Sequence, residues 1–431
     1  MPKAPVIIVG AGVVGMATAV FLRRDGHDVT VIDPAGPGEG CSYGNAGSIS
    51  PDMVIPMAMP GMMTKIPRWL FDPLGPLAIK PRYFPRALPW LLRWIESGRG
   101  ARVRTLSSHL RTLHRPVFEL YRELLGNAAE SHIRTAGQLY VWRGLEATST
   151  ELLSDALREV AGVHTEAVDA GQLREMEPAL GEDFRRGLYF PDNGHTADPR
   201  ALVRALAEEF ERAGGVIASR KAEGFEIGPS GVTAVRTSDG SLSASAVVIA
   251  AGAFSAPLAA AVGARVPLET ERGYHVSLPD PGITVNNKLS NREQMFSVTA
   301  MENGLRFAGT VEIAGLHAPP VAARTDVLLR HAKAMFPGLR TEGCEVWMGF
   351  RPSMPDSLPV IGRAPRIANA WLAFGHGHTG MTGAPMTGRL IADMIAGRPT
   401  AVDAAPYSPA RFAMIARTAQ RQEDRAEDRA A

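Results

Sequence analysis

Cysteine is scarce in this chain, and the sequence motifs of several enzyme classes are missing from it. Only 2 of the 431 residues are cysteine, Cys41 and Cys344, so we expect no disulfide framework and a reducing compartment. The sequence has no CxxC or HExxH pattern for a metal centre and no GxSxG pattern for a serine hydrolase. Its formal net charge of +2 gives no global reason to expect a nucleic-acid partner.

The first long apolar run, PVIIVGAGVVGMATAVFL, resembles a signal peptide or a short membrane span. It is interrupted by Gly10, Gly12, Gly15 and Thr18, so we expect a folded segment and a cytoplasmic chain. Hydrophobic residues make up 45% of the chain and charged residues 21%, which is typical of a globular protein. A chain of 431 residues exceeds the size at which a single core stops growing, so two domains are expected.

The order strand, glycine-rich turn, helix, strand appears within the first 33 residues. VIIVG and DVTVID are apolar, β-branched runs typical of buried parallel strands. Between them, Gly10-x-Gly12-x-x-Gly15 permits a tight turn and a close backbone approach to a pyrophosphate, and the following helix N-terminus donates to the phosphates. Asp33 ends the second strand, where an acidic residue accepts from ribose hydroxyls. The unit predicts a Rossmann-type dinucleotide site.

Three later segments favour one long cofactor over NAD. CSYGNAGSIS (41–50) follows the second strand and is rich in small residues, IAAGAF (249–254) ends a buried strand, and FGHGHTGMTGAP (374–385) carries four glycines before a helix. A backbone can lie close to a bound ring only where side chains are small, and a helix N-terminus offers a second dipole. Each segment alone would be interpreted as a plain turn. Together with the first unit they indicate a cofactor that crosses the domain.

The remaining pattern predicts an α/β domain followed by a second, α+β domain. DPRALVRALAEEFERAGG is expected to be a helix with Asp198 as its N-cap, and Asp239-Gly240 is expected to turn a hairpin. Helix is expected over 104–126 and a closing helix over 387–397. GQLYVW has the composition of a strand, and ERGYHVSL and GLRFAGTVEI are the expected strands of a second sheet.

The chain resembles the flavoprotein superfamily of D-amino-acid oxidase, glycine oxidase and bacterial D-amino-acid dehydrogenase, and is most similar to the D-amino-acid and D-hydroxyproline dehydrogenases. The matching pieces span nearly the whole length: IIVGAGVVGMATAVFLRRDGHDVTVID, SYGNAGSIS, VVIAAGAFS, ERGYHV, GFRPSMPDSLPVIG and GHGHTGMT. The resemblance implies FAD, a discontinuous FAD-binding domain (1–50, 196–264 and 341–415) and a substrate domain with a mainly antiparallel sheet (51–195 and 265–340). The charged stretch 416–431 is expected to be a tail outside both domains.

The resemblance also assigns cofactor residues. It places Ser42, Asn45, Ala46 and Gly47 on the flavin side and Ala251 and Gly252 nearer the adenosine. The sequence departs from the dehydrogenase pattern at Cys41, Tyr43 and Ser48, which bears on substrate preference. The full set of expected cofactor-binding residues is Gly10, Gly12, Val13, Val14, Gly15, Asp33, Pro34, Cys41, Ser42, Asn45, Ala46, Gly47, Ala251, Gly252, Gly375, His376, Gly377, Gly380, Met381 and Thr382.

Arg351 is the main candidate for substrate binding. It lies in GFRPSMPDSLPVIG, a segment stiffened by prolines, and the resemblance gives it the substrate carboxylate. The alternative is a structural ion pair with Asp356 or Glu345. Tyr274 is expected as a second donor, with His275 and His378 as neighbours, each of which could instead be a structural histidine. His376 and His378 form an H-x-H pair without an adjoining carboxylate or cysteine cluster, so no metal is expected.

The resemblance implies FAD-dependent oxidation of a D-amino acid, or of a cyclic imino acid such as D-proline or D-hydroxyproline, by hydride transfer to flavin N5 in amino acid catabolism. Three alternatives stay open: a flavin 2-hydroxy-acid dehydrogenase, an FAD-carrying subunit of a larger complex, and an NAD-dependent dehydrogenase. The electron acceptor is expected to be a quinone or another component of an electron-transfer chain.

One segment differs from the near-neutral chain. Residues 73–118 carry nine basic residues and a single acid, Glu96, interleaved with Trp90 and Trp94 and preceded by MVIPMAMPGMM (53–63). Basic segments with aromatic residues lie on anionic membranes. We therefore expect 53–118 to be either a peripheral contact with the inner face of the cell membrane or a packed lid over the flavin domain.

Overall fold

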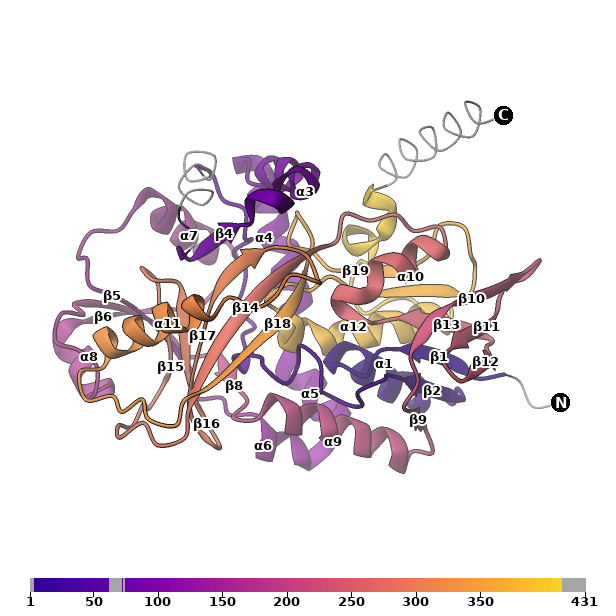
Figure 1. Ribbon diagram of the computed structural model, residues 1–431, viewed down its shortest axis with the longest axis horizontal. Helices are drawn as coiled ribbons and strands as arrows, with labels where there is room; N and C mark the ends of the chain where they lie inside the picture. The colour runs from indigo at the N-terminus through magenta and orange to yellow at the C-terminus, as the bar shows by residue number, and fades with distance from the viewer. Residues whose placement is uncertain (1–3, 62–71, 73, 413–431) are drawn as a thin grey trace.

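The computed structural model describes residues 4–61, 72 and 74–412, and Figure 1 shows two domains side by side. The cofactor domain is built on a six-stranded sheet that is parallel except for its edge strand β19. Its short apolar strands are largely buried on both faces, as βαβ crossovers require, except at the edge strand β9, where Val216 is 55% exposed. In spatial order they are β19 (Val360–Arg363), β20 (Ala370–Phe374), β13 (Ala246–Ile249), β1 (Val6–Val9), β2 (Val29–Ile32) and β9 (Val216–Ala218).

Helices cover one face of this sheet and form its larger core. Asp198 caps α9 as expected, since its carboxylate accepts from the backbone N–H groups of Arg200 and Ala201. The other face carries a small antiparallel sheet, in which the expected turn at Asp239-Gly240 joins β11 to β12. The helices of the first face are α1 (Val13–Arg24), α4 (Gly100–His114), α5 (Val117–Leu125), α6 (Ala129–His132), α9 (Pro199–Arg212) and α12 (Gly380–Ile395); the second face has β10 (Ala222–Gly228), β11 (Gly231–Thr237), β12 (Gly240–Ser243) and α10 (Ser255–Ala261).

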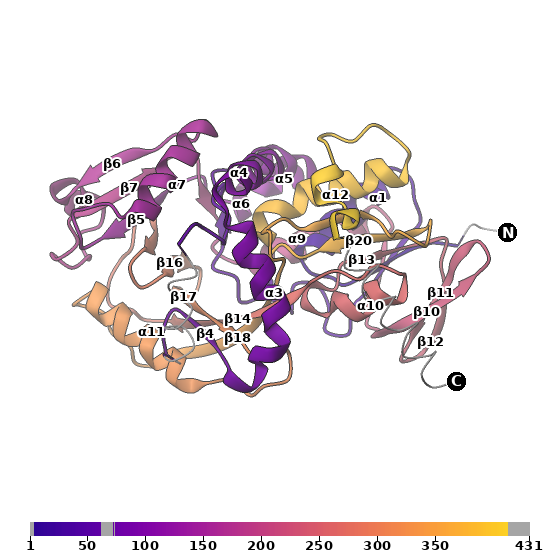
Figure 2. The same cartoon turned by 90° about the horizontal axis from the view of Figure 1, so that it is seen from above.

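The second domain is a large, mainly antiparallel sheet with α11 (Ala322–Met335) packed on it. Among the residues that the structure describes, two of its strand pairs are parallel, β5–β15 and β4–β17, and the others are antiparallel. At its far end lie α7 (Ser149–Val160) and α8 (Ala170–Met176), as Figure 2 shows from above. The strands are β18 (Glu345–Ser353), β14 (Glu269–Leu278), β17 (Gly304–Ile313), β16 (Phe296–Met301), β15 (Lys288–Asn291), β5 (Gln138–Trp142), β7 (Arg186–Phe190) and β6 (Glu166–Asp169), with β4 (Leu77–Ile79) beside β17.

The expected fold class, a Rossmann-type FAD domain plus an α+β domain with a mainly antiparallel sheet, is confirmed. Two segments lie in the other domain from the one expected. Strand β18 falls within 341–415 but pairs along its whole length with β14 of the larger sheet. Helices α4 and α5 fall within 51–195 but bury Leu106, Leu113 and Tyr121 in the core of the cofactor domain. Hydrophobic periodicity identifies an apolar helix face but not the surface against which it packs.

Two helix boundaries also differ from expectation. The predicted helix over 104–126 is divided at Pro116 into α4 and α5, because proline lacks the N–H that would continue the ladder. The closing helix α12 begins at Gly380 rather than near 387, with Pro385 in its second turn. Proline cannot donate to the Met381 carbonyl four residues earlier, but that carbonyl accepts from the Tyr121 hydroxyl at 2.7 Å instead, so the acceptor is still satisfied.

Helix α3 (Phe84–Ser97) carries the two tryptophans of the basic segment. Trp90 and Trp94 are both 6% exposed and pack with Ile79 and Ile313, so these rings face the protein and are not available to a membrane. Leu88 and Leu92 remain on the surface, at 38% and 59% exposure. In the part of the chain that the structure describes, no helix is both long and apolar enough to span a bilayer. Met62, Met63 and the tail 416–431 lie outside the described residues.

Candidate active site

The glycine-rich turn after β1 is held by contacts that leave no room for side chains at two of its three glycines. Gly10 has φ +112°, and a β-carbon there would lie 2.5 Å from the carbonyl oxygen of Ala250. A β-carbon on Gly15 would lie 1.9 Å from the carbonyl oxygen of Gly10, so the helix can pack against the strand only with glycine at this position. Gly12 differs, because its β-carbon would meet nothing closer than Ser42 Oγ at 3.5 Å. The space in front of Gly12 is therefore open.

Helix α1 begins at this opening without a side-chain cap. Its N-cap is Gly12, which has no side chain, and the hydroxyl of Ser42 accepts from the Val13 N–H at 3.2 Å. An uncapped N-terminus presents N–H donors and a partial positive charge to an anion. Ser42 comes from the predicted loop 41–50, so the structure brings this loop to the glycine-rich turn. The donors and the open space fit a pyrophosphate at this position.

Asp33 ends β2 and holds the same turn from the other side. Its carboxylate accepts backbone N–H groups of Ala11 at 3.0 Å, Ala35 at 2.8 Å and Gly36 at 3.2 Å. An ionised carboxylate offers about four lone-pair sites, so these bonds leave capacity for a ribose hydroxyl. A hollow of about 430 Å³ opens beside Asp33 and is lined in part by Ile217 and Ser219. Asp33 thus fixes the turn and also faces free space.

The loop 41–50 bridges the two domains through backbone carbonyls. The His275 ring contacts the Gly44 carbonyl at 3.0 Å, and Thr299 donates to the Ala46 carbonyl at 2.8 Å. Arg306 donates to the carbonyls of Tyr43 at 3.1 Å and Asn45 at 2.8 Å. The loop's last residue, Ser50, donates its N–H to Thr382 Oγ1 at 3.1 Å. These bonds join α1, the large sheet and the start of α12 around the segment assigned to the flavin side.

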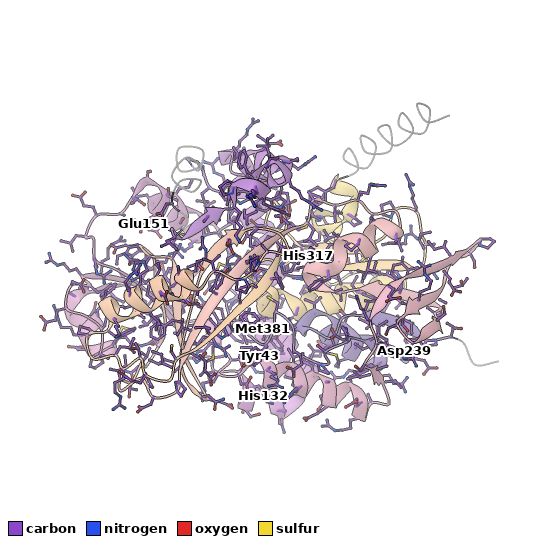
Figure 3. All side chains as sticks on the ribbon, in the orientation of Figure 1. Tyr43, His132, Glu151, Asp239, His317 and Met381 are labelled. Carbon is purple, nitrogen blue, oxygen red and sulfur yellow. The ribbon has the colours of Figure 1, made fainter. Side chains whose placement is uncertain are left out.

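The predicted segments 249–254 and 374–385 reach the same region. Ala251 lies against Gly10, since a β-carbon on that glycine would be 3.0 Å from Ala251 Cα. Helix α12 starts after Thr379 with no side-chain cap, which leaves a second helix N-terminus free to donate. Met381 is buried and its carbonyl accepts from Tyr121 at 2.7 Å. Tyr43 and Met381 both project onto the centre of the molecule in Figure 3. Two uncapped helix ends and a small-residue loop between them fit FAD.

The side chain of His376 faces inward, away from this space. It is 3% exposed, and its Nε2 lies 2.8 Å from Thr387 Oγ1 within α12. Burial, together with the neighbouring His114, lowers the pKa of His376 to about 3, so its ring is neutral. The segment 374–385 therefore faces the site with its backbone. Its two glycines next to His376 have positive φ values, +89° at Gly375 and +54° at Gly377. The side chain of His376 is thus engaged within α12, which leaves its main chain as the part that could meet a cofactor.

Arg351 lies near the end of β18 with its guanidinium across the neighbouring strand. A β-carbon on Gly273 would lie 2.1 Å from Arg351 Cζ, so this glycine is what allows the guanidinium to lie flat on the sheet. Its Nη1 donates to the carbonyl of Thr310 at 3.0 Å. Thr310 has φ +56°, a strained value for a β-branched residue. Burial lowers the pKa of Arg351, whereas Glu271 and Cys41 raise it. The guanidinium remains charged.

Neither ion-pair partner considered from the sequence binds Arg351. Asp356 instead pairs with Arg411, whose Nε lies 2.8 Å from Asp356 Oδ2. Glu345 is exposed at the start of β18. Within the described residues Arg351 forms no ion pair, and its one hydrogen bond goes to a carbonyl. Most of the planar fork is therefore left for another acceptor.

Glu271 and His378 form a pair directly beside Arg351. Glu271 of β14 is the register partner of Arg351 in β18, and its Oε2 lies 2.7 Å from His378 Nε2. Glu271 is 5% exposed. Burial alone would raise the pKa of Glu271, but the hydrogen bond and charge of His378 and the charge of Arg351 outweigh burial and lower it. Glu271 is thus an ionised carboxylate within the predicted substrate site.

His275 lies on the same face of β14, two residues beyond Gly273. Its ring stacks on Trp347 with centroids 5.1 Å apart, and a β-carbon on Gly44 or on Gly349 would collide with the same indole. Burial, with the charges of Arg306 and Arg351, lowers the pKa of His275 to about 4. His275 is therefore neutral near pH 7, with its Nδ1–H donating to Gly44. The neutral His275 ring thus lines the site together with Trp347 and brings no positive charge to it.

Tyr274 is not brought together with Arg351. Successive strand residues face opposite sides of a sheet, and the Tyr274 hydroxyl lies on the far face, where it donates to Glu312 Oε2 at 2.7 Å. Arg272 on that face pairs with the same carboxylate at 3.1 Å. The Tyr274 hydroxyl also accepts the N–H of Val321 at 3.1 Å. Tyr274 is therefore not placed to donate to a substrate carboxylate beside Arg351, as was expected. Its side chain faces the opposite side of the sheet from that of Arg351, which lies over the adjacent residue Gly273.

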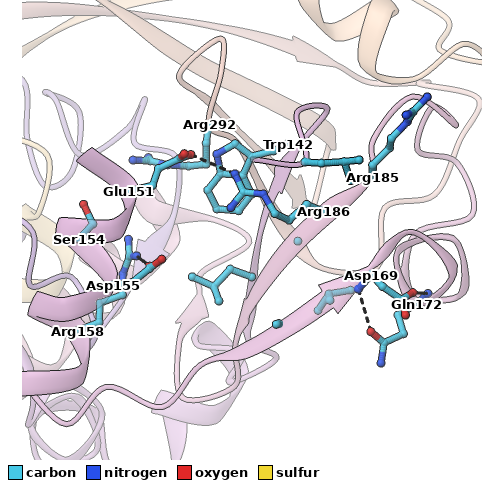
Figure 4. A pocket seen from close by; sticks show the side chains of 15 residues that line it. Trp142, Glu151, Ser154, Asp155, Arg158, Asp169, Gln172, Arg185, Arg186 and Arg292 are labelled. Atoms are coloured by element: carbon cyan, nitrogen blue, oxygen red, sulfur yellow. Dashed lines mark hydrogen bonds and ion pairs between the residues drawn. The ribbon is translucent and has the colours of Figure 1, made fainter. Parts of the chain in front are cut away.

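The pocket in Figure 4 lies elsewhere, in the far end of the second domain, and has a volume of about 500 Å³. Its lining includes none of the predicted site residues. Arg158 pairs with Asp155 at 2.6 Å, and Arg186 lies 3.5 Å from Glu151 and stacks on Trp142. These arginines are largely neutralised within the pocket. It is separate from the candidate active site.

Two site residues were missed from the sequence, Glu271 and Trp347. Glu271 is the first residue of the noted motif ERGYH and Trp347 lies two residues before GFRP, and both share the face and the strands of residues that were named. Counting alternate positions outward from Arg351 and His275 would have found them. Cys41, expected on the cofactor side, lies near Arg351, whose charge lowers the thiol pKa while burial, the larger effect, raises it.

Comparison with known proteins gives consistent similarities. The family model described as "DAO: FAD dependent oxidoreductase" matches residues 5–394. A D-amino-acid oxidase of Bradyrhizobium diazoefficiens is 40% identical over 415 residues, covering 94% of this chain and 98% of the relative. The D-amino acid dehydrogenase 2 of Mesorhizobium japonicum is 34% identical over 417 residues, covering 92% and 98%. In fold, the solved L-proline dehydrogenase of P. horikoshii is similar with a TM-score of 0.73 at 19% identity, covering 96% of this chain and 98% of that one.

Proposed function

The chain belongs to the DAO family of FAD-dependent oxidoreductases, and we propose that it oxidises the α-carbon of D-amino acids or of cyclic imino acids such as D-proline and D-hydroxyproline. The cofactor is FAD. Both kinds of substrate carry a carboxylate and a nitrogen on the same α-carbon, and the site has to recognise this pair of groups. In the cell such an activity would belong to amino acid catabolism.

The observation that carries the proposal is the placement of Arg351. Its guanidinium lies flat over Gly273 and gives one hydrogen bond to a carbonyl, while the carboxylate considered as its partner, Asp356, is bound by Arg411. A planar fork with free donors matches a carboxylate through two parallel hydrogen bonds. We assign the substrate carboxylate to Arg351 on this basis.

FAD, when bound, supplies the acceptor for the electrons of the α-C–H bond. The residues of the chain orient the reactants. Arg351 would fix the carboxylate, and the His275–Trp347 stack would exclude water on one side. Gly12, Val13 and Ser42 would hold the pyrophosphate, and the loop Asn45–Gly47 with the start of α12 would hold the flavin end. Positioning of this kind contributes much of the rate in a two-reactant step.

Anaerobic bleaching of the flavin tests the proposal. The purified protein is mixed with D-amino acids, sarcosine and the hydroxyproline isomers, and loss of flavin absorbance is followed. Bleaching by D-amino or imino acids at a rate well above that of their L-isomers is expected. Absence of bleaching by every member of the panel would overturn the proposal and would favour an FAD-carrying subunit of a larger complex.

The same purified protein also tests two alternative functions. Lactate and 2-hydroxyglutarate replace the amino acids to test a 2-hydroxy-acid dehydrogenase. A colourless protein that releases NAD on denaturation would indicate a nicotinamide enzyme, although the family match makes FAD the cofactor here.

For the electron acceptor we propose a quinone reached by peripheral contact with an anionic membrane. With Trp90 and Trp94 buried, the contact would use the exposed Leu88 and Leu92 of α3 with the exposed arginines Arg82, Arg86, Arg99, Arg102 and Arg104. Basic residues contribute about 1 kcal/mol each near such a surface. Flotation with phosphatidylserine vesicles at low salt should recover the protein, and neutral vesicles should not. Equal recovery from both, or none, would favour a packed lid and another acceptor.

A further inference from the structure

We propose that Glu271 binds the substrate's α-nitrogen and so makes the site select zwitterionic amino or imino acids over 2-hydroxy acids. This inference rests on the proposed function and specifies its substrate class. Glu271 and Arg351 are register partners on adjacent antiparallel strands, so their β-carbons lie about 5 Å apart on one face. A carboxylate and a guanidinium are thus presented side by side.

The two charges do not neutralise each other. Arg351 turns across Gly273 to the carbonyl of Thr310, and Glu271 turns to His378 at 2.7 Å. Opposite charges this close ordinarily form an ion pair when nothing else requires them. Here each has a partner that holds it away from the other, and a ligand that brings both charges would supply each of them with a counter-charge.

A zwitterion completes the charges of this pair. Arg351 and Glu271 sum to zero, so a bound carboxylate and ammonium leave each buried charge compensated. A 2-hydroxy acid brings only the carboxylate, and Glu271, held by His378, would then face a second anion with no ammonium from the ligand to offset it. Removing a charge partner within a buried site is costly because the remaining charge stays desolvated. Glu271 therefore selects against the hydroxy acid as well as for the amine.

His378 is a positioning residue in this arrangement. Its Nε2 holds one carboxylate oxygen of Glu271, and its side chain is 30% exposed whereas that of Glu271 is 7% exposed. The other charged groups that act on Glu271 are Arg351 from β18 and Glu269 from its own strand. Glu269 is held separately, by the hydroxyl of Tyr83 at 3.1 Å and the N–H of Thr270 at 2.8 Å. Glu271 is thus the carboxylate of this face that Arg351 and His378 both influence.

The test compares D-alanine with D-lactate, which have the same carboxylate and methyl group. In Glu271→Gln, kcat/KM for D-alanine should fall roughly thirty- to several-thousand-fold, and that for D-lactate should rise. Glu269→Gln, the same chemical change two residues away, should leave the preference unaltered. His378→Gln, which keeps an N–H donor near the Nε2 position, should retain the preference that His378→Ala weakens.

A binding measurement separates recognition from turnover. Propionate carries the carboxylate without a nitrogen, and its binding is followed through the flavin absorbance. Propionate should bind Glu271→Gln more tightly than wild type. If Glu271→Gln folds poorly, Glu271→Asp provides the second variant: it keeps the charge, so it should lose D-alanine activity without gaining D-lactate activity.

The possible failures are distinguishable. If wild-type protein is not bleached by any amino or imino acid, the proposed function fails and this inference fails with it. If D-alanine bleaches wild type but Glu271→Gln changes both substrates equally, or changes neither, the proposed function stands and the role of Glu271 is overturned.

Discussion

Gly388 of α12 lies so close to Ala17 of α1 that a β-carbon on the glycine would be 2.8 Å from the carbonyl carbon of Ala17. The two helices whose uncapped N-termini meet the cofactor region are thus packed backbone to backbone. We predict that Gly388→Ala forces them apart and lowers the free energy of unfolding by about 1–3 kcal/mol, despite the better helix propensity of alanine. The melting temperature and retained FAD should both fall. Gly100→Ala, where a β-carbon meets nothing within 4 Å, is the control and should not destabilise.

The open space before Gly12 leads to a second prediction. Gly12→Leu should abolish tightly bound FAD, because the side chain would fill the path of the pyrophosphate while the turn itself keeps its shape. FAD released on denaturation is measured in the supernatant and compared with the protein concentration. Gly100→Leu, a change of equal size on the surface, should retain wild-type FAD. Full FAD content in Gly12→Leu would show that the pyrophosphate does not bind at this turn.

Arg351→Leu is predicted to lower kcat/KM for a D-amino acid roughly thirty- to several-thousand-fold, from the about 2–5 kcal/mol typical of a lost buried charge contact. FAD content should stay near wild type, and Arg351→Lys should recover only part of the loss because an ammonium lacks the planar fork. The deciding substrate is a matched amine without the carboxylate. If Arg351→Leu lowers kcat/KM for this amine as much as it does for the amino acid, Arg351 has a structural role and does not bind the carboxylate.

Arg411 provides the matched control for that experiment. It binds Asp356 in the segment that follows β18, so Arg411→Leu removes a structural ion pair from the same part of the chain. This variant should lower the melting temperature. It should reduce the activity toward the amino acid and the matched amine by the same factor.

Lys288 of β15 gives a prediction on pH. Its side chain is 1% exposed, donates to Thr299 Oγ1 at 3.2 Å, and burial lowers its pKa from 10.5 to about 7. Between these two values the unfolded chain binds the proton and the folded chain does not, so the stability of the folded state rises with pH across this window, by at most about 1.4 kcal/mol per pH unit.

Lys288→Met should therefore raise the melting temperature at pH 7 and reduce its rise between pH 7 and pH 10. The difference between the two proteins isolates Lys288 from the other groups that titrate in this range. Melting curves by differential scanning fluorimetry at half-unit intervals measure it. Parallel curves for the two proteins would mean that Lys288 is charged in the folded state throughout.

The parts of the site predicted from sequence are those with a local signal. The turn from Gly10 to Gly15 and the Asp198 cap each follow from residues a few positions apart, and each lies where expected. For the segment with Arg351, the prolines argue against a helix but do not predict the strand that the structure shows. The face of β14 had no such signal. The strand is buried on both sides along nearly its whole length, so polar and apolar residues do not alternate. Tyr274 was chosen where Glu271 lies beside Arg351, because the register with β18 is a long-range property.

The same limit explains the domain assignments. Helix α4 lies within the basic segment 73–118 and α5 begins at its end, yet their apolar faces pack in the cofactor domain with α1 and α12. Strand β18 begins the run that ends in the closing helix, yet it pairs with β14. The local pattern predicted helix over 104–126 and predicted no strand at β18, and in both cases the packing decided the partner.

The end of β18 is joined by its backbone to the segment that precedes α12. Gly377 donates its N–H to the carbonyl of Pro352 at 2.7 Å, and Ser353 bridges to His376. The residue that would anchor the substrate and the helix that would face the flavin are thus parts of one hydrogen-bonded frame. A chain built this way can acquire a different substrate by exchanging the side chains that line the frame, such as Glu271 or Trp347, while the distance between the reacting centres is inherited unchanged.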